Sequence, residues 1–371
     1  MLTRIYINNF RCLVNFELTI DTINLFLGPN GAGKTSIFEV LLKLQKLIVA
    51  GQEVIALFKP TDLTRWQDVS IQRFELDIAG NGGVYRYSLA LQQEQARTQI
   101  QHERLLFDEQ PLFEFKIQAQ GGIAQLYHDD HTRGPKYPCD WSRSGIAALQ
   151  EMPDNKKLTW FKQRLARFII VHFNPAMMGS ESRQEEIRPN WDMSNYAAWF
   201  RHLSQDQGTI FDLTNQLRDI LPGFKAFKII PAGVAKILAV DFQQSGTKKT
   251  INYKFDELSD GQRVLIVLYT LLHCAPDEES YTLCIDEPEN FLALPEIQPW
   301  LDNLYDQCQD NQAQALLISH HPKLINYLAS HAGYWFSRQD NGPVRTHRVT
   351  DKDESGLSIA ELVARGWIYD D

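Results

Sequence analysis

The pattern of apolar and polar positions near the N-terminus predicts three strands and a helix in close succession. Residues 2–7 and 14–20 alternate between the two kinds of side chain, as the strands of a half-buried sheet do. Residues 23–27 are a short apolar run that leads directly into a glycine-rich turn. The segment after this turn carries an apolar stripe at helical spacing, formed by Ile37, Val40, Leu41, Leu44, Leu47 and Ile48. The order strand, turn, helix is the setting that a phosphate-binding loop requires.

Further along, the pattern predicts antiparallel strands and then helices. Residues 69–128 alternate over several runs, with turn signals at Asn81-Gly-Gly83 and Gly121-Gly122. Residues 155–225 are mostly typical of helices, and Pro222-Gly223 ends the last of them. We therefore expect an inserted helical lobe after an antiparallel β region.

In the C-terminal part, residues 226–230 and 236–242 resemble a strand pair. After them, the expected strands 281–285 and 315–318 alternate with the expected helices 258–274 and 295–309, which is the pattern of a parallel sheet. A further short strand is expected at residues 168–171, inside the helical region. We predict an α/β fold with a mixed sheet, an antiparallel β subdomain and a helical insertion. We expect a single domain over residues 1–371, because the chemical motifs stand at both ends and must meet. Its parts would be an N-terminal lobe at 1–135, the helical insertion at 140–225 and a C-terminal lobe at 226–371.

Composition places the chain among ordinary globular proteins, with 44% hydrophobic and 22% charged residues. The net charge of -9 argues against a wholly basic nucleic-acid coat but leaves room for a local basic patch. The five cysteines are far apart and form no Cys-x-x-Cys pair, which fits a reducing compartment without disulfides or zinc. No apolar stretch approaches the ~20 residues that cross a bilayer, and the N-terminus lacks the apolar core of a signal peptide. We expect a cytoplasmic protein without a membrane partner.

The glycine-rich turn, Gly28-Pro-Asn-Gly-Ala-Gly-Lys-Thr35, fits the P-loop pattern G-x-x-x-x-G-K-[ST] at every fixed position. Glycines let backbone N–H groups face phosphates, Lys34 can reach the β- and γ-phosphates, and the Thr35 hydroxyl can bind Mg²⁺. The helix that follows directs its positive end at the anion. We predict ATP and Mg²⁺ as ligands. The expected binding residues of the loop are Asn30, Gly31, Gly33, Lys34, Thr35 and Ser36.

A second motif, Tyr281-Thr-Leu-Cys-Ile-Asp-Glu-Pro288, is an apolar strand that ends in two acids, as a Walker B motif does. Asp286 would hold Mg²⁺, directly or through water, and Glu287 would polarise the attacking water. A solvated acidic turn would explain the two acids equally well if they stood alone. The P-loop upstream favours the catalytic interpretation.

Two further motifs stand near the Walker B strand. Leu258-Ser-Asp-Gly-Gln-Arg263 opens a helix, with Ser259 as a good N-cap and Gly261 as a position that permits close backbone approach. Ile318-Ser-His-His-Pro322 comes directly after an apolar strand. By themselves, these motifs are also compatible with a capped helix and a structural pair of histidines.

In this order, the four motifs resemble those of ABC-type ATPases. Residues 258–262 are similar to the signature motif of that family, usually Leu-Ser-Gly-Gly-Gln, and residues 318–322 resemble its switch-histidine loop. The start, Ile5-Tyr-Ile-Asn-Asn-Phe-Arg11, the string Asp286-Glu-Pro-Glu289 and the ending at 356–366 resemble the SMC/RecF/OLD branch, the AAA15/AAA_21-like ATPases of the AAA family, rather than transporter subunits. The resemblance covers nearly the whole chain and is loosest in the middle.

The resemblance implies that two heads form a homodimer head to tail, with each ATP between the P-loop of one head and the signature of the other. The signature would contact the γ-phosphate bound by a partner's Lys34, and hydrolysis would release the dimer. His320 would sense the γ-phosphate, with His321 as the alternative. The further nucleotide-contacting residues that the family implies are Arg11, Ser259, Gly261 and Gln262.

The sequence departs from the family pattern at three places. Asp260 replaces the first glycine of the signature and puts an acid near the phosphates, which would slow hydrolysis unless it is a variant of this branch. Leu292-Ala-Leu-Pro295 stands where such ATPases often have Leu-His-Pro. No Q-loop glutamine can be located, and Asn174 is the candidate equivalent.

Two polar segments could bind a ligand, nucleic acid in one case and a metal ion in the other, but each also has an ordinary structural explanation. The basic helix could follow a nucleic-acid backbone, although a solvated helix face is the more common explanation of such a charge run. Its members are Lys156, Lys157, Lys162, Arg164 and Arg167, with Trp160 and Phe161 between them. His128-Asp-Asp-His131 has a metal-like composition, but a polar hairpin tip accounts for it more simply.

We predict a soluble ATPase that dimerises on ATP and switches a separate effector protein, a nuclease or toxin in antiphage defence. The chain itself shows no acidic cluster after His321 of the kind that a fused TOPRIM nuclease would carry. The main alternative is a RecF-like repair ATPase that binds DNA directly. A transporter subunit and a nucleotide sensor without turnover are further alternatives.

Overall fold

The computed structural model describes residues 1–94, 97–118, 121–244, 246, 249–273, 280–349 and 357–365. Of the sequence features above, Cys274 and both ends of the segment 356–366 lie outside these residues. The chain divides into two compact units. The first comprises Met1–Phe168 and Leu328–Asp371, and the second comprises Ile169–Tyr327.

An eight-stranded sheet forms much of the first unit, with the strand order β2-β1-β4-β5-β6-β7-β8-β9. Its strands are β1 (Leu2–Asn8), β2 (Phe16–Thr19), β4 (Ile71–Gly80), β5 (Gly83–Glu94), β6 (Arg97–Phe107), β7 (Gln110–Gln118), β8 (Gly121–Tyr127) and β9 (Arg133–Cys139). Every neighbouring pair is antiparallel, which confirms the predicted β region. The sequence did not predict β9, because Pro135 and Pro138 interrupt it, and such prolines are tolerated on an edge strand.

The P-loop belongs to a smaller group of elements in the same unit. Strand β3 (Ile23–Leu27) is buried at every position and leads into helix α1 (Lys34–Ile48). Strand β17 (Gly333–Arg338) runs parallel to β3 and pairs antiparallel with β18 (Val344–Arg348). The predicted apolar stripe of α1 is buried, with Ile37, Val40 and Leu44 at 0% exposure. The elements around the P-loop therefore come from both ends of the chain: β3 and α1 from the N-terminal part and β17 from the C-terminal part. Its short helices are α2 (Val54–Leu57) and α9 (Ile359–Arg365), and α8 (Pro322–Ala332) leads into it.

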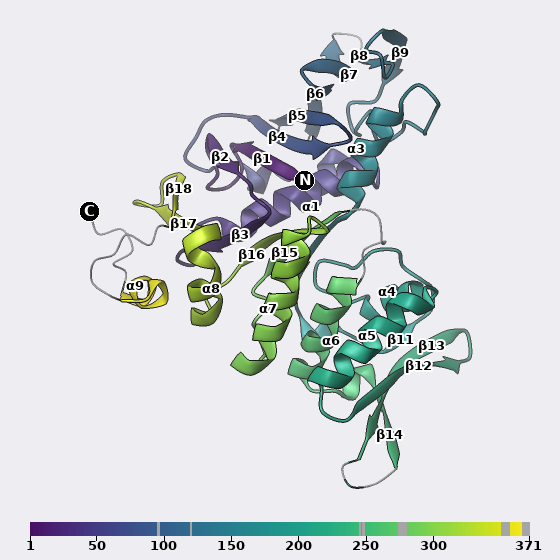
Figure 1. Ribbon diagram of the computed structural model, residues 1–371. Helices are drawn as coiled ribbons and strands as arrows, with labels where there is room; N and C mark the ends of the chain where they lie inside the picture. The colour runs from purple at the N-terminus through teal and green to yellow at the C-terminus, as the bar shows by residue number, and fades with distance from the viewer. Residues whose placement is uncertain are drawn as a thin grey trace. The chain divides into compact units, whose positions relative to one another are not determined.

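Helix α3 (Lys156–Ala166) covers part of the antiparallel sheet (Figure 1). The Trp160 ring stacks on Tyr85 of β5 at a centroid distance of 4.9 Å, and Phe161 stacks on Tyr87 at 5.7 Å. A side chain on Gly80 would place its Cβ 2.4 Å from the Trp160 ring, so this strand end must be glycine. The aromatic residues of the basic helix are therefore packing residues.

The second unit holds a parallel core. Strands β10 (Phe168–His172), β15 (Tyr281–Asp286) and β16 (Ala313–Ile318) lie in this order, and β15 and β16 are parallel. Helix α6 (Asp260–His273) packs against both α5 (Gln207–Ile220) and α7 (Leu294–Gln309) (Figure 1). The Trp300 indole of α7 is fully buried and donates its N–H to the Leu268 carbonyl oxygen at 3.0 Å. The predicted strands and helices of this region are confirmed.

A small antiparallel sheet completes the second unit. Strands β11 (Glu181–Ser182), β12 (Phe224–Ala232) and β14 (Thr250–Lys254) all relate to β13 (Ala235–Gln243), which pairs with each of them. Helix α4 (Tyr196–Leu203) packs beside it. The segment 140–225 thus contains helices α3, α4 and α5, and also β10 of the parallel core. The whole is the mixed α/β fold that the sequence predicted.

No helix in the described ranges is long and apolar enough to cross a membrane.

Glu103 of β6 should make stability depend on pH. Its carboxylate is fully buried, accepts hydrogen bonds from Ser144 Oγ, Gly145 N and the Tyr87 hydroxyl, and burial raises its pKa from 4.5 to about 6. The folded protein therefore keeps this proton to a higher pH than the unfolded chain does. The contribution of Glu103 to the free energy of unfolding is fully present below pH 4.5. It is lost as the pH rises through 6, which lowers the free energy of unfolding by about 2 kcal/mol.

We expect E103Q to remove this pH-dependent part of the free energy of unfolding, measured by urea unfolding at pH 4.5 and 7.5. The exposed-site variant E94Q serves as the control, and identical pH profiles for wild type and E103Q would contradict the assignment.

Candidate nucleotide-binding and hydrolysis site

The P-loop needs glycine for two physical reasons, a left-handed backbone and close neighbours. Gly28 has a φ of 136°, and a Cβ there would lie 2.2 Å from the Phe336 carbonyl oxygen of β17. Gly33 has a φ of 95°, and its Cβ would lie 2.9 Å from Cys12 Sγ and from Val344 Cγ2. Gly31, with a φ of 77°, has open space around its Cβ position. The loop therefore packs closely against β17 and against the residues before β2.

Lys34 begins α1 and directs its ammonium group into the loop. Its Nζ donates to the carbonyl oxygens of Gly28 at 2.7 Å and Pro29 at 3.1 Å, and the residue is 6% exposed. Asn30 and Gly31 lie exposed on the other side of the turn. A cation and the N-terminal end of a helix at one place form a strongly anion-binding arrangement.

Arg11 is anchored near this helix by acids. Its Nη1 lies 2.7 Å from Glu39 Oε1 of α1, and its Nε lies 3.6 Å from Asp62 Oδ1. The Arg11 backbone N–H donates to the Asp62 carbonyl oxygen at 2.7 Å. The guanidinium group is half-exposed, so it is held in place while one side stays open.

The Walker B acids stand at the end of β15 in different surroundings. Asp286 is 5% exposed, and His172 Nδ1 of β10 lies 3.8 Å from its Oδ2, too far for a hydrogen bond. Glu287 has a left-handed backbone with a φ of 54° and donates its N–H to the Ile318 carbonyl oxygen at 2.9 Å. Asn290 Nδ2 donates to Glu287 Oε2 at 2.6 Å. The positive φ turns the chain sharply, which separates the buried acid from the more accessible one.

The sequence analysis did not select Glu289, although it noted the string in which Glu289 stands. Glu289 is 9% exposed, and its Oε1 accepts hydrogen bonds from Ser319 Oγ at 2.7 Å and from the His320 N–H at 3.1 Å. Burial raises the pKa of this carboxyl. A carboxylate two residues after the Walker B pair was the available signal, but its partners lie in a loop 30 residues away.

The two histidines of the switch loop differ in their surroundings. His320 is exposed, whereas His321 Nδ1 accepts a hydrogen bond from the Lys323 N–H at 3.2 Å and so caps helix α8. Burial lowers the pKa of His321. The ring of His321 therefore has a local structural role, and His320 is the more exposed of the two histidines.

The signature residues form a reciprocal cap on α6. Ser259 Oγ accepts from the Gln262 N–H at 3.3 Å, and Gln262 Oε1 accepts from the Ser259 N–H at 3.2 Å. Asp260 forms an ion pair with Arg263, which also donates to the Pro175 carbonyl oxygen at 2.6 Å. The unusual acid of the signature is therefore partly neutralised within its own helix.

Gly261 is required by a neighbour in the same chain. A Cβ at this position would lie 2.7 Å from the carbonyl oxygen of Phe291, in the loop that follows the Walker B motif. The signature helix and this loop are thus in close contact. Phe291 itself is 55% exposed and has a φ of 73°.

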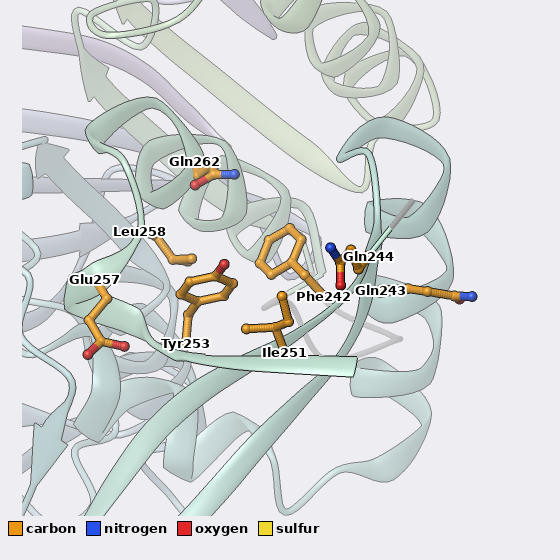
Figure 2. A pocket seen from close by; sticks show the side chains of 8 residues that line it. All are labelled: Phe242, Gln243, Gln244, Ile251, Tyr253, Glu257, Leu258 and Gln262. Carbon is orange, nitrogen blue, oxygen red and sulfur yellow. The ribbon is translucent and has the colours of Figure 1, made fainter. Parts of the chain in front are cut away.

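A pocket of about 440 Å³ adjoins the signature (Figure 2). One wall consists of Glu257, Leu258 and Gln262, and the opposite wall comes from strands β13 and β14. The rings of Phe242 and Tyr253 lie 6.0 Å apart at 76° on that wall. Figure 2 shows Gln262 on one side of the hollow and these two rings on the other.

The predicted site residues thus fall into two groups. The P-loop residues and Arg11 belong to the first unit, and the signature, Asp286, Glu287 and His320 belong to the second. Within the second unit, hydrogen bonds join the Walker B loop to the switch loop, and close packing joins it to the signature. Asn174 is exposed before a short 3-10 turn, Pro175–Met177. His172, two residues earlier, has its Nδ1 3.8 Å from Asp286 Oδ2.

Residues of the basic helix and of the string at 128–131 make contacts within the protein. Lys162 Nζ donates to the carbonyl oxygens of Ala147 and Leu149, burial lowers its pKa, and Arg164 is 1% exposed. The prediction of a solvated face is therefore wrong for these two residues, and they offer no free charge to DNA. Asp129 accepts hydrogen bonds from the N–H groups of Lys156 and Lys157 and so caps α3. Among the described residues, no group of three His, Cys, Asp or Glu side chains could hold a metal ion.

Known proteins match the chain in two segments. A family described as "AAA ATPase domain" matches residues 1–75, and one described as "AAA domain, putative AbiEii toxin, Type IV TA system" matches residues 172–326. An OLD nuclease from Thermus scotoductus is 44% identical over 41 residues. That match covers 11% of this chain and spans 8% of the length of the nuclease.

Solved structures of SMC heads share the fold. A head bound to the C-terminal winged-helix domain of ScpA has a TM-score of 0.54 at 11% identity, covering 94% of this chain and 98% of that one. A head with an extended coiled coil bound to the C-terminal domain of ScpA, derived from Pyrococcus furiosus, has a TM-score of 0.52 at 10% identity, covering 94% and 96%. These likenesses define the fold as that of an ABC-type P-loop ATPase head. Together with the matched segments, they support an ATPase of the SMC/RecF/OLD branch, as the motifs predicted.

Alanine at Gly28 and at Gly31 should separate the two requirements of the P-loop. We expect G31A to cost about 1 kcal/mol of unfolding free energy, because only the left-handed backbone opposes it. G28A also drives a methyl group into the backbone of β17 and should cost about 3 kcal/mol or more. Denaturant unfolding without nucleotide measures both. Equal losses would show that the contact with Phe336 does not constrain the loop.

Proposed function

We propose that this chain is an ATPase in which ATP joins two copies head to tail and hydrolysis separates them. The observation that carries the proposal is the P-loop, where Lys34 Nζ rests on two loop carbonyl oxygens at the N-terminus of α1. Carbonyl oxygens are neutral acceptors, so the ionised oxygens of a phosphate can replace them with stronger, charge-assisted bonds.

In this proposal, the residues of the two units act on one nucleotide. The loop from Asn30 to Ser36 holds the phosphates, and Arg11 approaches them from its anchored position. Thr35 and Asp286 would hold Mg²⁺, which neutralises charge on the β- and γ-phosphates when it is bound. Glu287 orients the attacking water, and His320 contacts the γ-phosphate.

The capped N-terminus of α6 supports a role in trans. Ser259 is exposed, so it can meet a phosphate bound by another copy, together with Gly261 and Gln262. The pairing of Asp260 with Arg263 reduces the repulsion that an acid would exert on that phosphate. The helix end then contributes its positive dipole to the site.

We further propose that the ATP cycle switches a separate effector protein, a nuclease or toxin in antiphage defence, in the cytoplasm. The short match to an OLD nuclease and the toxin–antitoxin description of the second segment support this choice. The RecF-like alternative, direct DNA binding, has less support, because Lys162 and Arg164 of the basic helix are engaged inside the protein. A nucleotide sensor without turnover is distinguished by measuring phosphate release.

Trapping the bound state tests dimerisation. We expect E287Q to bind ATP, to release phosphate at least about 100-fold more slowly, and to run as a dimer with ATP and Mg²⁺ in size-exclusion chromatography with light scattering. K34A should stay monomeric, because it lacks the cation that holds the β- and γ-phosphates. An E287Q protein that remains monomeric at saturating ATP refutes the dimer.

Mixing two inactive variants tests the shared site. S259R blocks the signature but keeps its own P-loop, whereas K34A keeps its signature. In a mixed dimer, one site combines the intact P-loop of the first with the intact signature of the second. We expect mixing to restore up to about half of the wild-type ATPase rate per mixed dimer, measured as phosphate release. The K34A/S259R double variant mixed with K34A is the control and should stay inactive. Failure of the first mixture to recover shows that the signature does not act in trans.

A further inference from the structure

Glu289 links the two loops that follow the parallel strands β15 and β16. One oxygen, Oε1, accepts both the Ser319 hydroxyl at 2.7 Å and the His320 N–H at 3.1 Å. Ser319 is fully buried, and its Oγ in turn accepts the His321 N–H at 3.0 Å. Three successive residues of the switch loop are therefore fixed, directly or through one hydroxyl, by a single carboxylate.

This carboxylate is costly to keep at its position. Glu289 is 9% exposed, and in the described part of the chain its Oε2 is buried without a hydrogen-bond partner. Burying a carboxylate with one oxygen unsatisfied destabilises a protein, so a residue of this kind is expected where it has a function. An apolar residue would fill the same space at lower cost, but it would leave the His320 backbone unfixed.

The two loops have a second connection. The Glu287 N–H donates to the Ile318 carbonyl oxygen at 2.9 Å, directly before Ser319. The backbone of the switch loop is thus held at residue 318 by the Walker B loop and at residue 320 by Glu289. His320 itself is an exposed residue, although its backbone N–H is held by the Glu289 carboxylate.

We propose that Glu289 is a positioning residue for hydrolysis, which sets His320 relative to Asp286 and Glu287. The inference rests on the proposed ATPase function. In this role, the buried Glu289 carboxylate joins the switch loop to the Walker B loop and fixes the distance between His320 and the two Walker B acids. Such support for reacting groups is effective because small displacements of a catalytic group cost large factors in rate.

A double-mutant cycle in the full chain tests this role. We expect E289A to lower kcat for ATP hydrolysis about 30-fold and to change KM less than about threefold, because the P-loop residues are in the other unit. H320A should lower kcat at least as much, and E289A/H320A should be no slower than the slower single variant within about twofold. Non-additivity of this kind marks residues that act as a unit.

E289Q and E296A give the matched controls. The amide oxygen of E289Q can still accept from Ser319 and His320, so we expect kcat within about fivefold of wild type. Glu296 is a nearby acid whose Oε2 accepts the Ala293 N–H at 2.8 Å and caps α7, and E296A should leave kcat unchanged. If E289A does not fold, as judged by circular dichroism, S319A replaces it in the cycle, since it removes the hydroxyl between Glu289 and the His321 N–H.

The possible outcomes distinguish a failure of the positioning role of Glu289 from a failure of the proposed ATPase function. Wild-type kcat in a folded E289A protein, or rate losses of E289A and H320A that multiply, overturn the positioning role alone. Full activity in H320A overturns both that role and the switch assignment. Full activity in K34A overturns the proposed ATPase site itself.

Discussion

The ammonium group of Lys34 rests on the carbonyl oxygens of Gly28 and Pro29, and the geometry of the P-loop depends on that contact. Gly28 also allows the loop to lie directly against the backbone of β17. Carbonyl oxygens are neutral acceptors, and a charged phosphate oxygen forms a stronger hydrogen bond with an ammonium group than they do. The C-terminal strand β17 therefore helps to set the shape of the P-loop.

The second unit holds acidic side chains close together, whereas the P-loop of the first unit holds a cation. Asp286 and Glu289 are both buried, and Glu287 stands between them on a strained backbone. For Glu289, a serine hydroxyl and a backbone N–H group supply hydrogen bonds that compensate part of the cost of burial. The signature uses a side chain instead, because the Asp260 carboxylate has Arg263 one turn further along its own helix.

Features with a local cause could be predicted from the sequence, and features with a distant cause could not. The P-loop, the strand before it and the apolar stripe of α1 follow from neighbouring residues, and so does the acidic end of β15. The environment of the basic helix was misjudged because the partners of Lys162 are carbonyl oxygens of Ala147 and Leu149, and the Trp160 ring stacks on a tyrosine of β5. Glu289 was passed over for the same reason, since nothing near it in sequence indicates that Ser319 and the His320 N–H will meet it. The metal-like string at 128–131 contains Asp129, which caps a helix that begins at Lys156.

The predicted site residues belong to two units of the chain. The groups suited to holding phosphates and the groups suited to activating water are built by separate parts of the chain, each with its own internal supports. In the proposed cycle, ATP is the ligand that requires both sets at once, and a second copy supplies the signature. The hydrogen bonds that fix Glu289 and the switch loop lie within the second unit, so we expect substitutions there to alter hydrolysis more than ATP affinity. Such a bias suits a switch, in which the lifetime of the ATP-bound state must be adjusted without losing affinity for ATP.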